Sequence, residues 1–133
     1  MQINITAISK YTIVALAGAG WLLLGSMIQP HTQINADEYY YSDLLRNNYS
    51  YLVAGLFLFT GFISGYFFDL HPWLTGLSLV MVFLVACFYE MTVYRGSHNL
   101  IPIELGMYLL FASPGIVGNY LGRFLRSRSI RSK

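Results

Sequence analysis

The chain has 133 residues, of which 56% are hydrophobic and only 11% are charged, and its formal net charge is +2. Soluble globular domains carry about 25% charged residues, so this composition excludes an ordinary soluble domain and indicates that lipid is the solvent. The length fits a single domain. One cysteine, Cys87, excludes an intramolecular disulfide framework and paired-thiol redox chemistry.

Four apolar segments are long enough to cross the hydrocarbon core of a bilayer, which takes roughly 20 helical residues. None alternates polar and apolar residues as a barrel strand would, and a spanning segment must satisfy its backbone internally, so the sequence predicts helices. The predicted spans are residues 11–28, 51–68, 73–93 and 100–121. No small-x-small cleavage site follows the first span closely, so we expect it to be retained. Cys87, in the third span, should pack as a small apolar side chain.

The one long connection, residues 29–50, is rich in tyrosine, which suits an aromatic belt at the membrane–water interface. The alternative is a loop that binds a partner or covers a ligand. A short amphipathic helix around residues 40–45 is compatible with both interpretations. The very short connections on either side of the third span predict that the second, third and fourth helices are antiparallel neighbours.

The basic residues predict the orientation of these spans. Five of the eight Lys and Arg residues lie in residues 122–133, so we expect this tail to be cytoplasmic. With four spans the N-terminus, which carries Lys10, is then cytoplasmic too. The loop of residues 29–50 falls outside, and its three acids against Arg46 give a net charge of −2 that suits the outer side. The sequence therefore predicts an all-α membrane protein: four transmembrane helices in an antiparallel bundle with both termini in the cytoplasm.

Small residues predict how the helices approach one another, because close backbone contact supplies much of the packing in lipid. Gly61 and Gly65 form a GxxxG pair in the second span, and Gly118 and Gly122 form another in the fourth. Such pairs serve either contacts within the bundle or a homodimer face, and we expect the first.

The fourth span contains Pro114, which removes the helical hydrogen bond to the carbonyl of Leu110, so we expect a kink near mid-membrane. Asn119 lies in the same span and needs a hydrogen-bond partner at this depth. We expect the freed carbonyl or a neighbouring helix to provide it. The alternative is that Asn119 lines a polar cavity reached from the cytoplasmic half.

The connection between the third and fourth spans gathers the polar groups Glu90, Arg95, His98, Asn99 and Glu104. Glu104 lies near the positive end of a helix, which stabilises its charge, whereas Glu90 lies near a negative helix end and needs a cation or a proton. We expect a hairpin staple in which Glu90 pairs with Arg95, while His98 and Asn99 bond Glu104 or helix-end carbonyls.

The alternative is that Glu90, His98 and Glu104 converge as a small outward-facing site that binds a divalent ion or relays a proton. Their spacing matches no metal motif, and Arg95 opposes cation binding, so we predict no metal site. Phosphate-loop, CxxC, HExxH and GxSxG motifs are also lacking, so we expect neither an enzyme nor a cofactor. The basic tail should anchor the topology and attract anionic lipid rather than bind nucleic acid.

From Glu90 onward, the pattern "SHNLIPIE" followed by "ASPGIVGNYLGR" resembles the C-terminal half of small, uncharacterised four-helix inner-membrane proteins of bacteria. The resemblance implies a bacterial inner (plasma) membrane and no particular activity. We expect a structural or accessory component of a membrane assembly that contacts the lipid bilayer and either a second copy or a larger complex. The alternative is a minimal ion or small-solute transporter that uses the outer-face Glu/His/Glu cluster.

Overall fold

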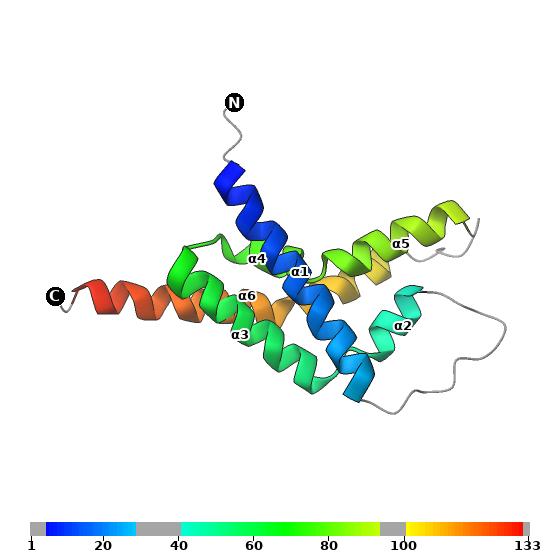
Figure 1. Cartoon of the computed structure of the whole chain (residues 1–133), viewed down its shortest axis with the longest axis horizontal. Coiled ribbons are helices and arrows are strands. Elements are labelled where there is room, and N and C mark those ends of the chain that lie inside the picture. The colour runs from blue at the N-terminus through cyan, green and yellow to red at the C-terminus, as the bar shows by residue number, and fades with distance from the viewer. Residues whose placement is uncertain (1–4, 29–40, 94–100, 132–133) are drawn as a thin grey trace.

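The computed structural model describes residues 5–28, 41–93 and 101–131, in which every regular element is a helix. In chain order these are α1 (Ile5–Ile28), α2 (Tyr41–Asn47), α3 (Tyr51–Phe68), α4 (Pro72–Leu79), α5 (Met81–Val93) and α6 (Ile101–Arg131) (Figure 1). Helices α1, α3 and α6 are long and apolar enough to cross a membrane, and the bent pair α4–α5 makes up to one more span. The prediction of an all-helical chain with several candidate membrane spans is confirmed.

Two helices extend beyond the predicted spans. Helix α1 begins at Ile5, and α6 continues to Arg131, so most of the predicted basic tail of residues 122–133 is part of that helix. Hydropathy predicts only the apolar part of a helix that lies in lipid, whereas the helix itself continues until it reaches a residue that disfavours helical structure. After Gly122 the sequence contains no further Gly or Pro, and Leu and Arg are good helix formers, so α6 has no reason to stop earlier.

The third predicted span, residues 73–93, is broken into two helices, since α4 and α5 are bent by 52° relative to each other. Between them Val80 has φ −95° and ψ 7°, and its carbonyl accepts the Phe83 N–H at 3.0 Å. In a regular α-helix that N–H would bond the carbonyl of Leu79. The Leu79 carbonyl instead faces Gly18 of α1, where any side chain would collide with it. The break therefore coincides with the place where α1 packs.

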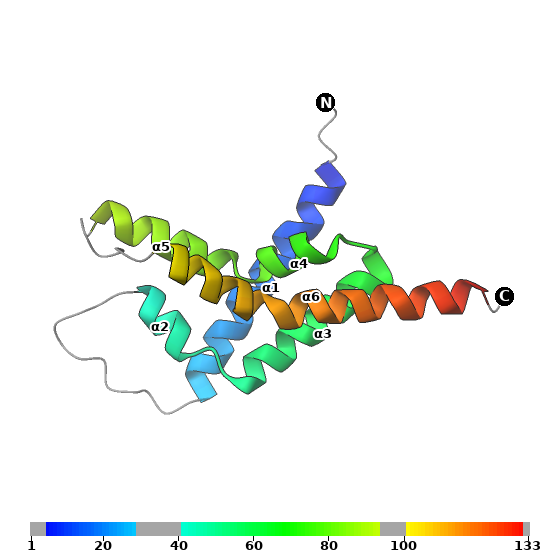
Figure 2. The same cartoon turned by 180° about the vertical axis from the view of Figure 1, so that it is seen from behind.

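The most extensive helix interface in the described part of the chain joins α3 and α6, which lie side by side and run in the same direction (Figures 1 and 2). These are the second and fourth predicted spans, and the third predicted span contacts both of them through α4. At four positions a glycine lies directly against a carbonyl of the other helix, in the pairs Gly61–Gly115, Gly65–Asn119, Gly118–Leu58 and Gly122–Phe62. Both GxxxG pairs thus face each other within one chain, where Cα–H groups approach carbonyl oxygens.

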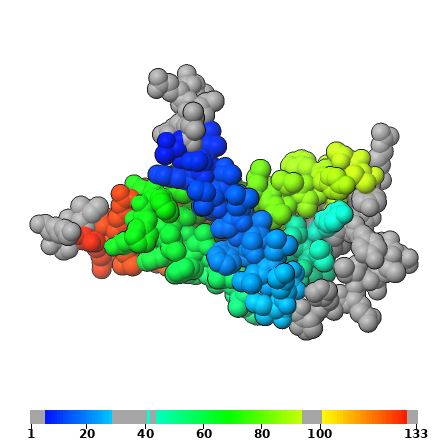
Figure 3. Space-filling model, in the orientation of Figure 1, coloured from blue at the N-terminus to red at the C-terminus, as the bar shows by residue number. Residues whose placement is uncertain are grey.

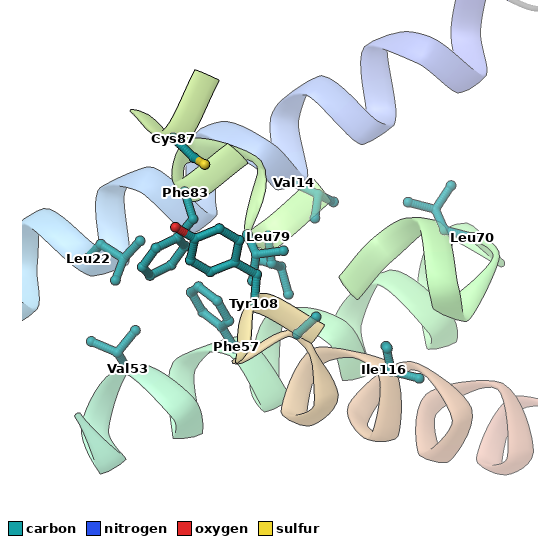
Figure 4. Close-up of a cluster of buried hydrophobic side chains, with 12 residues drawn as sticks. Val14, Leu22, Val53, Phe57, Leu70, Leu79, Phe83, Cys87, Tyr108 and Ile116 are labelled. Atoms are coloured by element: carbon teal, nitrogen blue, oxygen red, sulfur yellow. The ribbon is translucent and has the colours of Figure 1, made fainter. Parts of the chain in front are cut away.

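Helix α1 crosses the other helices on the face seen in Figure 3. Among the described residues, Trp21 Nε1 donates to Thr60 Oγ1 at 2.9 Å, and the Tyr11 hydroxyl accepts the His71 N–H at 3.0 Å, so hydrogen bonds attach α1 to α3 and to the α3–α4 turn. Apolar side chains from α1, α3, α4, α5 and α6 meet to form the core (Figure 4). Phe57 and Phe83 are the largest side chains that are fully buried there.

Candidate functional site

Two of the polar residues predicted from sequence, Glu90 of α5 and Glu104 of α6, belong to one group of side chains. The Cys87 Sγ donates a hydrogen bond to Glu104 Oε2 at 3.6 Å, and both carboxylates act electrostatically on Cys87 and on Tyr108. The Arg46 guanidinium, from α2, also acts on Tyr108. We call these five residues (Arg46, Cys87, Glu90, Glu104 and Tyr108) the carboxylate cluster.

Helix periodicity explains this gathering. Cys87 and Glu90 are three residues apart on α5, and Glu104 and Tyr108 are four apart on α6, so each pair lies on one helix face. Phe83, one turn before Cys87, packs its ring 5.3 Å from the Tyr108 ring and joins the two faces. Glu104 lies in the first turn of α6, as predicted, where the helix dipole favours an anion.

Burial differs sharply within the carboxylate cluster. Glu90 is 0% exposed, Cys87 4% and Tyr108 3%, whereas Glu104 is half-buried and Arg46 is exposed. Glu90 is therefore shielded from both lipid and water, and a charge in such a place requires polar partners. Arg46, Glu90 and Glu104 each make at least one further polar or electrostatic interaction within the protein.

Sequence reasoning missed Arg46, because it treated this residue only as part of the loop charge. The sequence was compatible with a short helix around residues 40–45, and the structure has α2 at Tyr41–Asn47, where it packs against α5. Tyr41 and Tyr89 make an edge-to-face contact with ring centroids 5.9 Å apart. An arginine on a short helix that also carries Tyr41 and two leucines was the available signal, but α5, which this helix contacts, lies about forty residues further along the sequence. Cys87 packs in the core as expected, and its thiol also donates a hydrogen bond to the Glu104 carboxylate, which the sequence did not indicate.

Arg95, His98 and Asn99 lie outside the described residues, so the predicted Glu90–Arg95 staple stays a prediction. Within residues 5–28, 41–93 and 101–131, no group of three or more His, Cys, Asp or Glu side chains is arranged to hold a metal ion.

A second buried polar group lies deeper in the bundle. Asn119 is fully buried, and its Nδ2 donates to Thr75 Oγ1 of α4 at 3.0 Å. The Thr75 hydroxyl in turn donates to the carbonyl of His71 at 3.1 Å. The sequence left open whether the carbonyl freed by Pro114 or a neighbouring helix would be the partner of Asn119, and the structure has the neighbouring helix α4. Within the described part of the chain, Asn119 Oδ1 accepts no hydrogen bond.

The carbonyl freed by Pro114 is satisfied locally. Helix α6 continues through Pro114, and the Ser113 hydroxyl donates to the Leu110 carbonyl at 2.7 Å. One residue further on, the Tyr49 hydroxyl donates to the Phe111 carbonyl at 2.8 Å. Two side chains thus donate to backbone carbonyls around the proline, one of them from the α2–α3 connection.

Comparisons with known proteins add no assignment to this geometry. No family model, curated protein or solved structure matches the chain. The resemblance over the C-terminal half stays a prediction, and the function is argued from the arrangement of side chains alone.

Proposed function

We propose that this chain is a structural or accessory component of a membrane assembly, inserted in the inner membrane of a bacterium with both termini in the cytoplasm. The support is that most residues of each long helix are not buried against the rest of the chain. In α1, α3 and α6 only 22% to 28% of the residues in the most apolar window are buried inside the protein. The remaining surface is available to lipid or to other membrane helices.

The observation that carries the proposal is the placement of three glycines on this uncovered surface. A side chain added at Gly20, Gly55 or Gly106 would meet no atom within 4 Å. Glycine offers lipid little apolar contact, but it allows another helix to approach closely, which is how this chain uses its buried glycines. Open glycines on three separate spans therefore favour contacts with further helices, from a second copy or from a larger complex.

The polar groups of the bundle support an internal structural role. Glu90, Asn119 and Thr75 are all fully buried. The cluster around Glu90 joins α2, α5 and α6, and the Asn119–Thr75 bond joins α4 and α6. Because the backbones of α3 and α6 touch at glycines, there is no space between these two helices for a solute pathway.

The test is co-purification from mildly solubilised native membranes, with the wild type compared with the Gly20→Leu and Gly106→Leu variants. We expect the wild type to elute as a homo-oligomer or with other membrane proteins, and the variants to lose those partners while keeping their thermal stability. A wild-type chain that elutes from native membranes as a monomer with lipid alone would contradict the proposal.

The second candidate is a minimal ion or small-solute transporter, which the burial of Glu90 beside Glu104 favours. A carboxyl group enclosed in a membrane protein often binds or relays a cation or proton. The Glu90→Gln variant separates the two functions, since glutamine keeps the shape but not the charge. Transport predicts that a flux across liposomes is lost while the fold survives. An accessory role predicts no flux in the wild type and altered assembly or stability in the variant.

A further inference from the structure

The charges of this protein are divided between the two ends of its long helices. Glu104 lies in the first turn of α6, in the same cluster as Glu90 and Arg46. The last turns of α6 carry only basic residues among their ionisable groups. Lys10 of α1 lies at this second end too, because its Nζ is 5.8 Å from the centre of the Phe68 ring at the end of α3.

One acid meets these cations in the described part of the chain. Asp69 caps the C-terminus of α3 in the left-handed conformation, with φ 53° and ψ 37°. Its carboxylate lies 3.0 Å from Arg123 Nε and 3.7 Å from Arg126 Nη1. A single negative charge thus faces two guanidinium groups, whose side chains remain 42% and 38% exposed. This end keeps an excess of positive charge before Lys10 and Arg128 are counted.

Two further cations, Lys10 and Arg128, are held against aromatic rings. The Arg128 guanidinium carbon lies 4.4 Å from the centre of the Phe124 ring, and Lys10 lies over Phe68. Both rings are about half exposed, at 51% and 50%. Such pairs suit a membrane interface, since the ring enters the hydrocarbon edge while the cation stays at headgroup depth.

The length of α6 puts the arginines at that depth. Its 31 helical residues span about 46 Å, roughly 16 Å more than the hydrocarbon core of a bilayer. With Glu104 near one boundary, the surplus falls at the C-terminal end. Because α6 stays helical to Arg131, these arginines are presented on a rigid rod beside Asp69 and Lys10.

We propose that this basic end, made of Lys10, Arg123, Arg126 and Arg128, binds the phosphate groups of anionic glycerophospholipids in the leaflet that surrounds it. Guanidinium groups match the geometry of phosphate oxygens, and each basic residue near an anionic surface strengthens association by about fivefold. Asp69 orients two of the arginines, while Lys10 and Arg128 are free of that ion pair. The proposal does not depend on whether the chain is an accessory protein or a transporter.

The experiment measures lipid retention by native mass spectrometry after the full chain is reconstituted in nanodiscs of mixed phosphatidylcholine and phosphatidylglycerol. The wild type should retain phosphatidylglycerol preferentially. In the Lys10→Gln/Arg128→Gln variant, which leaves the Asp69 ion pairs intact, this preference should fall by up to about 25-fold. The matched control is Arg46→Gln, which removes a cation at the opposite end and should leave the preference unchanged.

Three results would overturn the proposal: equal retention of the two lipids by the wild type, an unchanged preference in the double variant, or an equal loss in the Arg46→Gln control. A thermal unfolding scan of each variant in detergent shows whether the fold is intact. If the double variant unfolds early, the Arg128→Gln variant alone is compared instead, with an expected loss of about fivefold. Co-purification of partners is a separate measurement, so a failure here leaves the accessory role untouched.

Discussion

Single side chains complete the hydrogen bonding of the backbone around Pro114. Backbone groups inside a bilayer have no water to bond, so each unsatisfied carbonyl is costly. Ser113 bonds the Leu110 carbonyl from the same helix, but Tyr49 bonds the Phe111 carbonyl from the α2–α3 connection. Tyr49 also stacks on Phe111, with ring centroids 4.1 Å apart. Its hydroxyl therefore ties the start of α3 to the middle of α6.

The Tyr49→Phe variant tests this bond, because phenylalanine keeps the stacked ring and removes only the hydroxyl. We expect the free energy of unfolding to fall by about 1 to 3 kcal/mol, since the Phe111 carbonyl would lose a donor in a dry setting. Chemical or thermal unfolding in detergent measures the change. Tyr51→Phe is the matched control, because Tyr51 is 99% exposed and its change should be neutral.

We also expect the difference in stability between the wild type and the Tyr49→Phe variant to depend on pH. Burial raises the pKa of Tyr49 from 10.0 in the unfolded chain to about 12 in the folded protein. The folded state therefore keeps its proton where the unfolded state has lost it, so stability present below pH 10 is lost between pH 10 and pH 12. The stability advantage of the wild type over Tyr49→Phe should shrink across that interval. An advantage that stays constant from pH 9 to pH 12 would contradict the raised pKa of the half-buried Tyr49 hydroxyl.

At the scale of helices, the contact between α3 and α6 depends on positions that allow no side chain. In the Gly118→Leu variant the new side chain would collide with the Leu58 carbonyl of α3, a backbone atom that cannot turn aside. We expect a loss of about 1 to 3 kcal/mol or more in the free energy of unfolding, as for other overpacked interiors. Gly106→Leu is the control on the same helix, because no atom lies within 4 Å of that position. Equal thermal stability of the two variants in detergent would contradict the α3–α6 interface.

The attachment of α1 gives a second test at this scale. Gly18 faces the Leu79 carbonyl at the break between α4 and α5, whereas Gly20, two residues later, faces open space. Gly18→Leu should push α1 away and expose it to limited proteolysis, while Gly20→Leu should leave the cleavage pattern of the purified protein unchanged. If Gly18→Leu is also resistant, the α1 contact at the break is not needed to hold that helix.

The sequence predicted the helices well where their causes are local. Hydropathy located the apolar segments, and the GxxxG spacing marked glycines that lie at a helix interface. The break at Val80 was not predicted, because neither Val80 nor its immediate neighbours is Gly or Pro, and the contact that coincides with the break comes from Gly18 of another helix. The part played by Arg46 was missed for the same reason. Arg46 acts on Tyr108 of α6 and its helix packs against α5, but no local pattern connects α2 with either helix.

On the scale of the whole molecule, the arrangement predicts which segments share a membrane face. Lys10 lies near Phe68, and Arg123 pairs with Asp69, so the start of α1, the α3–α4 turn and the end of α6 lie together. Ser50 caps the opposite end of α3, in the same half of the molecule as α2. Whichever side of the membrane holds one member of the first group must therefore hold the others.

Cysteine labelling in cells tests both this grouping and its orientation. The Tyr51→Cys variant places a thiol at a fully exposed position at the start of α3, and His71→Cys places one in the exposed turn at its other end. Because basic residues stay in the cytoplasm, a membrane-impermeant maleimide should label Tyr51→Cys in intact cells and His71→Cys only in inverted vesicles. The wild type is the control, since Cys87 is only 4% exposed and should remain unlabelled in both. The reverse labelling would show that the arginine-rich end is outside, and equal labelling of both variants in intact cells would show that α3 does not cross the membrane.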